Sequence, residues 1–199
     1  MRYLILLVTL LLTGVAHAQS EEDVRPGDVV FHRSRSAQSR VIQEVTGSPW
    51  THVGVVFERE GALWVLEAVQ PVKWTRLGEW VRRGRGSELA IRRPRAALSG
   101  DALDTLRQSG ERFLGRPYDA RFEWDERRIY CSELVWLMFE DALGLRLSEP
   151  QRWQDLTLSR AARRLARRRL GRLPTPGSLI VTPVALLDSA SLFDPRAPE

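Results

Sequence analysis

The chain contains a single cysteine, Cys131, and its surroundings suit a nucleophile. The two residues that precede it, Ile129 and Tyr130, are typical of a strand, whereas residues 132–139 have the apolar pattern of a buried helix. We therefore predict that Cys131 lies at the N-terminus of a helix. The helix dipole and the unpaired N–H groups of the first turn favour a thiolate, which is the nucleophilic form of cysteine.

A histidine that can serve as a base, His52, begins a predicted strand. Residues 51–57 and 62–69 are rich in β-branched and apolar side chains, and Glu60-Gly61 fits the turn of a hairpin between them. A turn closed by these two residues places His52 and Glu67 on one face as diagonal neighbours, with Cβ atoms about 7–8 Å apart. A three-residue loop would instead send the two side chains to opposite faces.

These three side chains suggest the roles of a catalytic triad. Cys131 attacks a carbonyl, His52 takes the thiol proton and later protonates the leaving group, and Glu67 orients the imidazole. The backbone N–H of Cys131 is suited to stabilise the oxyanion. Gln38 and Tyr118 are candidates for the second oxyanion or substrate contact by residue type alone.

Structural explanations compete with each of these assignments. A lone cysteine is often a buried inert thiol, and the alternative base His32 also ends a predicted strand. We rank His32 below His52 because no carboxylate is placed to orient it. The sequence has no GxSxG, HExxH, CxxC or phosphate-binding glycine loop, so we expect no metal and no cofactor.

The first eighteen residues read as a secretory signal peptide. Arg2 supplies the positive charge, residues 4–12 form a short apolar run, and cleavage is expected after Ala18. The run is shorter than the roughly 20 residues of a membrane-spanning helix. We therefore expect an exported protein, periplasmic or secreted, with residues 19–199 forming a single domain.

The net charge of +5 comes almost entirely from arginine, since Lys73 is the only lysine. Basic residues concentrate between Arg160 and Arg172, on a predicted amphipathic helix. A solvated basic face is the simpler interpretation, and contact with an anionic membrane or cell-wall polymer is the functional one. No recognition motif supports nucleic-acid binding.

The remaining patterns complete a mixed set of strands and helices. Further elements are predicted at 29–31 (strand), 36–46 (helix), 74–84 (turn or helix), 89–93 (strand), from Ser99 or Asp101 to Leu114 (helix), 178–182 (strand) and 183–187 (helix). The helix that starts at Cys131 is the most apolar and should be buried, ending at Gly144. Strands around one buried helix indicate an α+β fold.

Six segments together carry a family resemblance. They are Gly27-Asp28-Val29-Val30-Phe31, Ser36-Ala37-Gln38-Ser39, Ser48-Pro49-Trp50-Thr51-His52-Val53-Gly54, Leu66-Glu67-Ala68-Val69, Gly115-Arg116-Pro117-Tyr118-Asp119 and Tyr130-Cys131-Ser132-Glu133-Leu134. The sequence resembles the bacterial YiiX/YaeF-type permuted papain-like amidases of the NlpC/P60 superfamily, from about Val24 to Pro183. It departs from the family at Trp50, where a smaller aromatic is usual, and in the arginine-rich insertion at 163–172.

The resemblance implies a circularly permuted papain-like fold, in which a small antiparallel sheet packs on a buried helix that carries the cysteine at its N-terminus. It also implies that His52, Glu67 and Cys131 act as base, orienting acid and nucleophile. We expect an exported cysteine hydrolase that cleaves an amide or ester through a thioester, with a cell-envelope substrate such as a peptidoglycan peptide. The alternatives are a lipid or acyl hydrolase or acyltransferase, a non-catalytic envelope-binding module, and a membrane-surface protein that acts through the basic helix.

Overall fold

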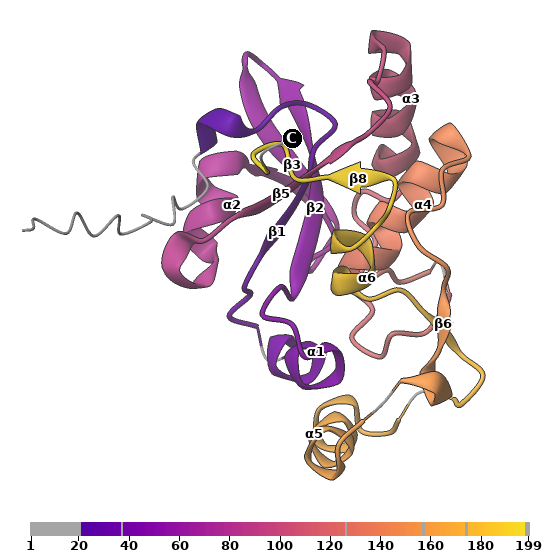
Figure 1. Cartoon of the computed structure of the whole chain (residues 1–199). Helices are drawn as coiled ribbons and strands as arrows, with labels where there is room; N and C mark the ends of the chain where they lie inside the picture. Colours follow the sequence, from indigo (N-terminus) through magenta and orange to yellow (C-terminus); the bar gives the residue numbers. More distant parts are fainter. Residues whose placement is uncertain (1–20, 37, 126, 157, 174, 198–199) are drawn as a thin grey trace, which may run out of the picture.

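The computed structural model describes residues 21–36, 38–125, 127–156, 158–173 and 175–197. The predicted signal peptide, residues 1–18, lies outside them. The centre of the molecule is an antiparallel six-stranded sheet with the strand order β4-β3-β2-β1-β5-β8 (Figure 1). Its strands are β1 Val29–His32, β2 His52–Arg59, β3 Ala62–Glu67, β4 Lys73–Arg76, β5 Ala90–Pro94 and β8 Leu192–Phe193.

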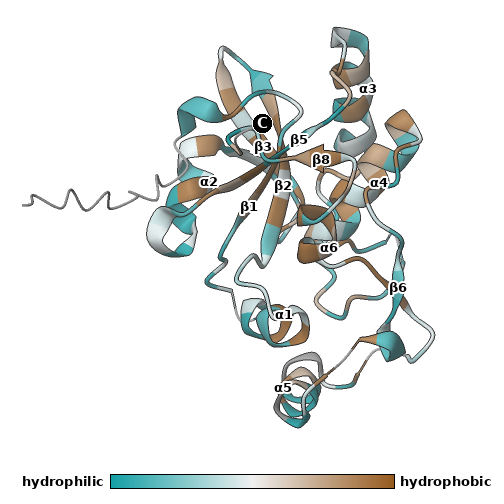
Figure 2. Cartoon of the chain, in the orientation of Figure 1, coloured by the Kyte–Doolittle hydropathy of each residue, from teal (hydrophilic) through white to brown (hydrophobic). Residues whose placement is uncertain are grey.

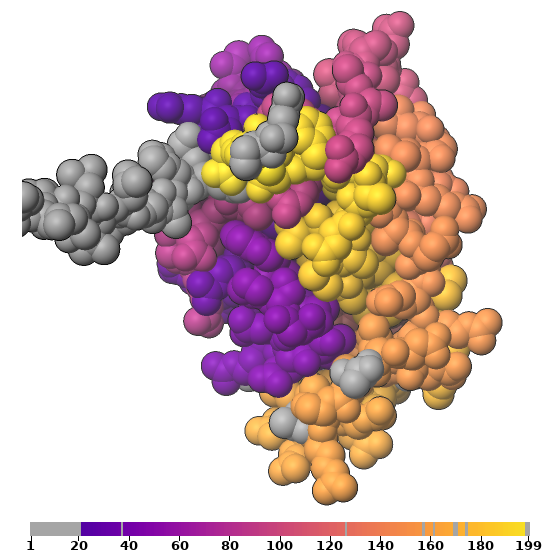
Figure 3. Space-filling view, viewed as in Figure 1, coloured from indigo at the N-terminus to yellow at the C-terminus, as the bar shows by residue number. Residues whose placement is uncertain are grey.

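Helices cover both faces of this sheet (Figure 1). The described helices are α1 Ser39–Thr46, α2 Leu77–Arg83, α3 Gly100–Glu111, α4 Cys131–Leu143, α5 Arg160–Leu170 and α6 Pro183–Leu187, with short 3-10 helices at Glu21–Asp23, Arg85–Ser87 and Trp153–Asp155. Of these, α1 and α5 pack in a separate cluster away from the sheet. A second, two-stranded sheet pairs β6 Gln151–Arg152 with β7 Leu179–Ile180. Figure 3 shows α1 and α5 together at one end of the molecule.

Alternation along the strands divides the core into two layers. In β1, Val29 and Phe31 pack in the larger cluster with α3, α4 and α6, whereas Val30 packs with Trp80 of α2. Figure 2 shows the apolar strands at the centre and apolar residues on α4 to their right. Helix α3 comes so close that a Cβ on Gly110 would lie 2.4 Å from Leu66 and 2.8 Å from Met138. The α+β class and the buried α4 are confirmed.

The hairpin between β2 and β3 has the predicted turn. Glu60 and Gly61 alone connect the strands, and both have positive φ values, 53° and 69°. Positive φ at both central positions suits the twist of a two-residue hairpin. Val55 pairs with Leu66 and Arg59 with Ala62, which is the register that the sequence predicted.

Two parts of the prediction differ from the structure. Residues 74–84, expected as a turn or helix, divide into the edge strand β4 and the helix α2. Strand β4 has only four residues, and both end residues are exposed and charged. A segment this short does not show the alternation of apolar and polar residues by which a strand is recognised. The two-residue strands β6 and β8 were missed for the same reason.

Candidate active site

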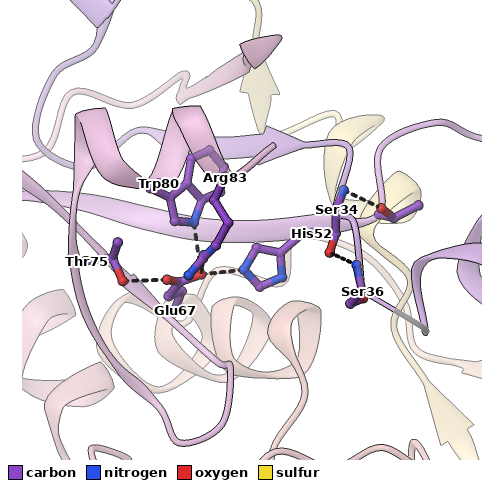
Figure 4. Close-up of polar contacts among 8 residues, drawn as sticks. Ser34, Ser36, His52, Glu67, Thr75, Trp80 and Arg83 are labelled. Atoms are coloured by element: carbon purple, nitrogen blue, oxygen red, sulfur yellow. Dashed lines mark hydrogen bonds and ion pairs between the residues drawn. The ribbon is translucent and has the colours of Figure 1, made fainter. Parts of the chain in front are cut away.

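His52 and Glu67 meet on the hairpin formed by β2 and β3. Nε2 of His52 lies 2.5 Å from Oε2 of Glu67, and both side chains are buried (Figure 4). This contact follows from the two-residue turn, which sets the diagonal relation of the two positions. A Cβ at position 54 would lie 2.4 Å from Val65 and 3.4 Å from Glu67, so Gly54 leaves the space that this arrangement needs.

Glu67 is fully buried, yet both of its carboxylate oxygens accept hydrogen bonds. Oε1 accepts from the hydroxyl of Thr75 at 2.6 Å, and Oε2 accepts from the indole N–H of Trp80 at 3.0 Å and from the guanidinium of Arg83 (Figure 4). Burial raises the pKa of Glu67, but the hydrogen bond from His52 and the charge of Arg83 outweigh it and lower that pKa to about 2. Glu67 is therefore ionised at neutral pH.

The imidazole of His52 is held in its protonated form. Burial lowers the pKa of His52, but its interactions with Cys131 and with Glu67 outweigh burial and raise that pKa to about 9. At neutral pH, His52 is therefore a cation between the carboxylate of Glu67 and the sulfur of Cys131. The structure thus brings the three predicted side chains together from β2, β3 and α4.

Helix α4 begins at Cys131, as predicted, and its first turn is fixed to the chain near β7. Tyr130 is the N-cap, and its backbone N–H donates to the carboxylate of Glu133 at 3.3 Å. Ser132 donates to the carbonyl of Val181 at 2.8 Å, while the Val181 N–H donates to the Tyr130 hydroxyl at 3.1 Å. These bonds hold the position of Cys131, which is 1 % exposed.

The two candidates for an oxyanion or substrate contact, Tyr118 and Gln38, occupy different positions in the site. Burial raises the pKa of the Tyr118 hydroxyl well above its usual range, and the neighbouring Cys131 raises it further. Tyr118 therefore stays a neutral hydrogen-bond donor beside the sulfur. Gln38 lies across the cleft, one residue before α1, and its side chain does not cap that helix. Both assignments stay predictions.

His32 lies beside His52 but has no acid to orient it. The two residues are paired across β1 and β2, with ring centroids 4.9 Å apart, and the His32 ring packs on Trp80 at 4.2 Å. Among the described residues neither ring nitrogen of His32 has a hydrogen-bond partner. Burial, followed by the charges of His52 and Arg83, lowers the pKa of His32 to about 2. His32 therefore stays neutral, which supports its lower rank as a base.

The buried neutral His32 predicts a specific acid sensitivity. Its folded pKa of about 2 lies below the ordinary value of 6.5, so the unfolded chain binds the extra proton and stability falls as pH drops below 6.5. At pH 5 this single group should cost about 2 kcal/mol. The raised pKa of His52 acts in the opposite direction in both proteins, so the difference between them isolates His32. From pH 7.5 to pH 5.0, urea unfolding should show a change in the free energy of unfolding that is less favourable in the wild type than in His32→Phe by about 2 kcal/mol. An equal change in both proteins would contradict the assignment.

Two hollows adjoin His52 and Cys131, one beside each residue. A cleft of about 370 Å³ is lined by polar residues that include Ser34, Gln38, His52, Arg83 and Tyr118, and by the apolar residues Ile42, Ala68, Val69 and Ala120. On the other side, Cys131 lines an apolar slot of only about 20 Å³, whose remaining walls include Val41, Phe122, Trp153 and Ile180.

Comparison with known proteins identifies the family. The model of the family described as "Permuted papain-like amidase enzyme, YaeF/YiiX, C92 family" matches residues 23–192. The chain belongs to this family. The predicted resemblance and the permuted papain-like fold are thereby confirmed.

Two relatives of this permuted papain-like amidase come from Escherichia coli. The uncharacterised protein YiiX of strain K12 is 35% identical over 193 residues, which cover 96% of this chain and 94% of YiiX. The crystal structure of YiiX from O157:H7, described as a metalloprotein, is similar with a TM-score of 0.81 at 36% identity. That match covers 85% of this chain and 94% of the YiiX chain.

Sequence reasoning missed three partners of Glu67 in this member of the family. Thr75 lies on β4, and Trp80 and Arg83 lie on α2, so all three come from the segment whose structure was predicted least well. The only available signal was a buried carboxylate in an apolar strand, which requires compensating donors somewhere in the fold. That signal shows that donors must exist, but it does not locate them.

Proposed function

We propose that this amidase is an exported cysteine hydrolase that cleaves an amide or ester bond through a thioester on Cys131. The observation that supports this most is the ionised Glu67 beside a protonated His52, at the helix N-terminus that carries Cys131. An imidazolium is the partner that a thiolate requires in a protein interior. The helix dipole of α4 acts in the same direction.

The proposed reaction has two halves. In the first, the sulfur of Cys131 bonds to the substrate carbonyl carbon, and the tetrahedral oxyanion accepts hydrogen bonds from the Cys131 N–H and the Tyr118 hydroxyl. The bond to the leaving group then breaks as His52 gives that group its proton. In the second half His52 takes a proton from water, the resulting hydroxide attacks the thioester, and the acid product leaves Cys131.

The shapes of the two hollows favour a polar substrate. The cleft of about 370 Å³ offers hydroxyl, amide and guanidinium groups beside aliphatic side chains, whereas the apolar slot beside Cys131 has about 20 Å³, little more than the space of one water molecule. An acyl chain would need the slot to widen. A peptide of the cell envelope, such as a peptidoglycan peptide, is therefore our first assignment, and a lipid or acyl substrate is the alternative.

No step of this mechanism is assigned to a metal. The related YiiX structure is that of a protein described as a metalloprotein. Within the described ranges of this chain, however, no three His, Cys, Asp or Glu side chains are grouped as a metal site requires. The described side chains therefore do not provide a site that fits a resident metal ion.

A trapped intermediate tests the proposed function. We expect incubation with peptidoglycan peptides, followed by acid quench and mass spectrometry, to show an acyl adduct on Cys131. An adduct formed only from fatty-acyl esters would replace the peptide assignment with the acyl one.

Selective alkylation separates an enzyme from a binding module. A reactive Cys131 should be carboxamidomethylated by iodoacetamide near neutral pH, and His52→Ala should slow the reaction because the imidazolium is lost. The matched control is His32→Phe, which removes a neighbouring ring that stays neutral. Slower labelling of the folded than of the urea-unfolded protein, unchanged by His52→Ala, would favour a binding module with an ordinary buried thiol.

We also propose that helix α5 binds to the surface of anionic membranes without crossing them. Its residues Ala162 and Ala166 are buried, and five arginines of the helix are exposed, namely Arg160, Arg163, Arg164, Arg167 and Arg168. Figure 2 shows the hydrophilic side of α5 turned away from α1. No helix among the described residues has the length and apolar character to cross a membrane.

Vesicle binding tests the role of α5. Each arginine near an anionic surface contributes about fivefold to binding, so Arg163→Gln/Arg167→Gln should weaken binding to phosphatidylglycerol vesicles by about 25-fold. The matched control, Arg127→Gln/Arg128→Gln, removes two exposed arginines from a loop outside α5. Cosedimentation measures both variants, and equal loss in both would show that only net charge matters.

A further inference from the structure

A second polar pocket adjoins the catalytic cleft and is lined by arginines. It has a volume of about 330 Å³, and its walls include Arg33, Arg35, Arg40 and Arg85. Ser34 and Ser36 line both this pocket and the cleft that holds His52, so the two hollows meet at these serines. Figure 4 shows Ser34 and Ser36 beside His52.

The arginines of this pocket have few negative partners. None of the residues that line it is acidic. Arg33 pairs with Glu88 at 3.1 Å, and its Nε is buried without a hydrogen-bond partner among the described residues. Arg35, Arg40 and Arg85 are exposed, and they form no ion pair within the described part of the chain.

The loop that carries the first two arginines is held in place. The Ser34 N–H donates to the Thr51 hydroxyl at 3.0 Å, the Ser36 N–H donates to the Ser34 hydroxyl at 3.1 Å, and the Arg85 N–H donates to the Arg33 carbonyl at 2.8 Å. In these bonds the oxygen of Ser34 is an acceptor, so its hydrogen can still be donated to a ligand. The backbone of this loop is therefore fixed, and residues with hydroxyl and guanidinium donors line one space.

We infer that this pocket is an anion-binding subsite that takes a phosphoryl group of the substrate, beyond the scissile bond. Four guanidinium groups around one space repel each other, and a dianion relieves that repulsion better than a single carboxylate does. Guanidinium forks also bind phosphoryl oxygens in pairs, which adds geometric selectivity. Because the pocket joins the cleft at Ser34 and Ser36, one extended molecule can occupy both.

The claim that the bound phosphoryl group belongs to the substrate rests on the proposed function. The claim that the pocket binds an anion does not. Direct binding therefore comes first. Calorimetric titration of the full mature chain with pyrophosphate should show one saturable site. Arg35→Gln/Arg40→Gln should weaken it by about 100-fold, since each charge-assisted hydrogen bond contributes about tenfold. The matched control Arg127→Gln/Arg128→Gln, on an exposed loop outside the pocket, should bind as the wild type does.

Three binding results would overturn the inference. They are no saturable binding of pyrophosphate, equal weakening in the control variant, and tighter binding of tricarballylate than of pyrophosphate, which would assign the pocket to carboxylates. Displacement of bound pyrophosphate by soluble glycerol phosphate would support a phosphate-bearing polymer or precursor. Displacement only by phosphatidylglycerol vesicles would support a phospholipid headgroup.

A kinetic comparison links the pocket to the reaction. The probe is a peptide anilide with and without a phosphoserine, and we expect the phosphorylated form to have a KM about tenfold lower with a similar kcat. Arg35→Gln/Arg40→Gln should abolish this difference. Equal KM values in the wild type would overturn the subsite and leave the hydrolase standing. Pyrophosphate binding without hydrolysis of either peptide would instead count against the proposed function.

Discussion

Replacing Cys131 with alanine should abolish hydrolysis, with kcat reduced by about 10⁴-fold or more, because the covalent intermediate can no longer form. The remaining rate would come from binding and from the oxyanion donors alone. The measurement is the initial rate on the substrate that acylates the wild type, at the same protein concentration. Mass spectrometry of the variant should show no acyl adduct.

The control for this substitution is a comparison of the folding stability of the variant and the wild type. Cys131 is 1 % exposed and packs in the main core, so losing its sulfur should lower the free energy of unfolding by about 1 kcal/mol. Thermal melts of both proteins measure this loss. Cys131→Ser retains the size of the side chain and should be nearly as inactive, since a hydroxyl is a much weaker nucleophile in this setting. Full activity in either variant would remove the proposed mechanism.

The contact between His52 and Glu67 was predictable from the sequence because it depends on local geometry. Two short segments and the turn Glu60-Gly61 set the strand register, and strand register sets which side chains share a face. The start of α4 at Cys131 was predictable in the same way, from a change of periodicity. Both inferences use rules that act over a few residues.

The surroundings of Glu67 were not predictable because they depend on tertiary packing. Thr75 reaches Glu67 from an edge strand, and Arg83 from the last turn of a seven-residue helix. Nothing in that segment of sequence distinguishes Arg83 from the adjacent Arg82, which is exposed. Only the packing of α2 on the sheet decides which arginine meets the carboxylate.

The same limit applies to the basic pocket. Arg33 and Arg35 follow β1, Arg40 lies on α1, and Arg85 follows α2, so the pocket gathers residues that are up to 52 positions apart. In a chain with 30 arginines and lysines, a sequence pattern does not single out four that converge. The hydrogen bond from the Arg85 N–H to the Arg33 carbonyl joins the two parts.

The donors around Glu67 indicate what the hydrolase requires of this residue. A buried carboxylate is costly unless it is hydrogen-bonded and paired, and here four side chains supply those bonds. The result is a fixed negative charge next to His52 that persists to low pH. Cys131 and this charge both raise the pKa of His52, and we propose that Glu67 contributes to the orientation of His52 as well as to its protonation.

Replacing Glu67 with glutamine should therefore change both the rate and its pH dependence. The amide has the shape of the carboxylate but no charge, so the pKa of His52 should fall from about 9 toward or below its ordinary value of 6.5. His52 must be protonated to serve the leaving group, so the wild-type rate should decline as pH rises through about 9. In Glu67→Gln that decline should move to lower pH, and kcat at pH 7.5 should fall about 10³-fold.

A matched variant separates charge from hydrogen bonding. Thr75→Val removes the bond to Oε1 but leaves the charge of Glu67 and its contacts with His52 and Arg83. We expect a rate loss of about tenfold or less in Thr75→Val, with the alkaline decline near its wild-type position. The two pH profiles of kcat/KM supply the comparison. If Glu67→Gln keeps the wild-type profile and loses only rate, Glu67 orients His52 without setting its charge, and the ion pair proposed between His52 and Cys131 loses its basis.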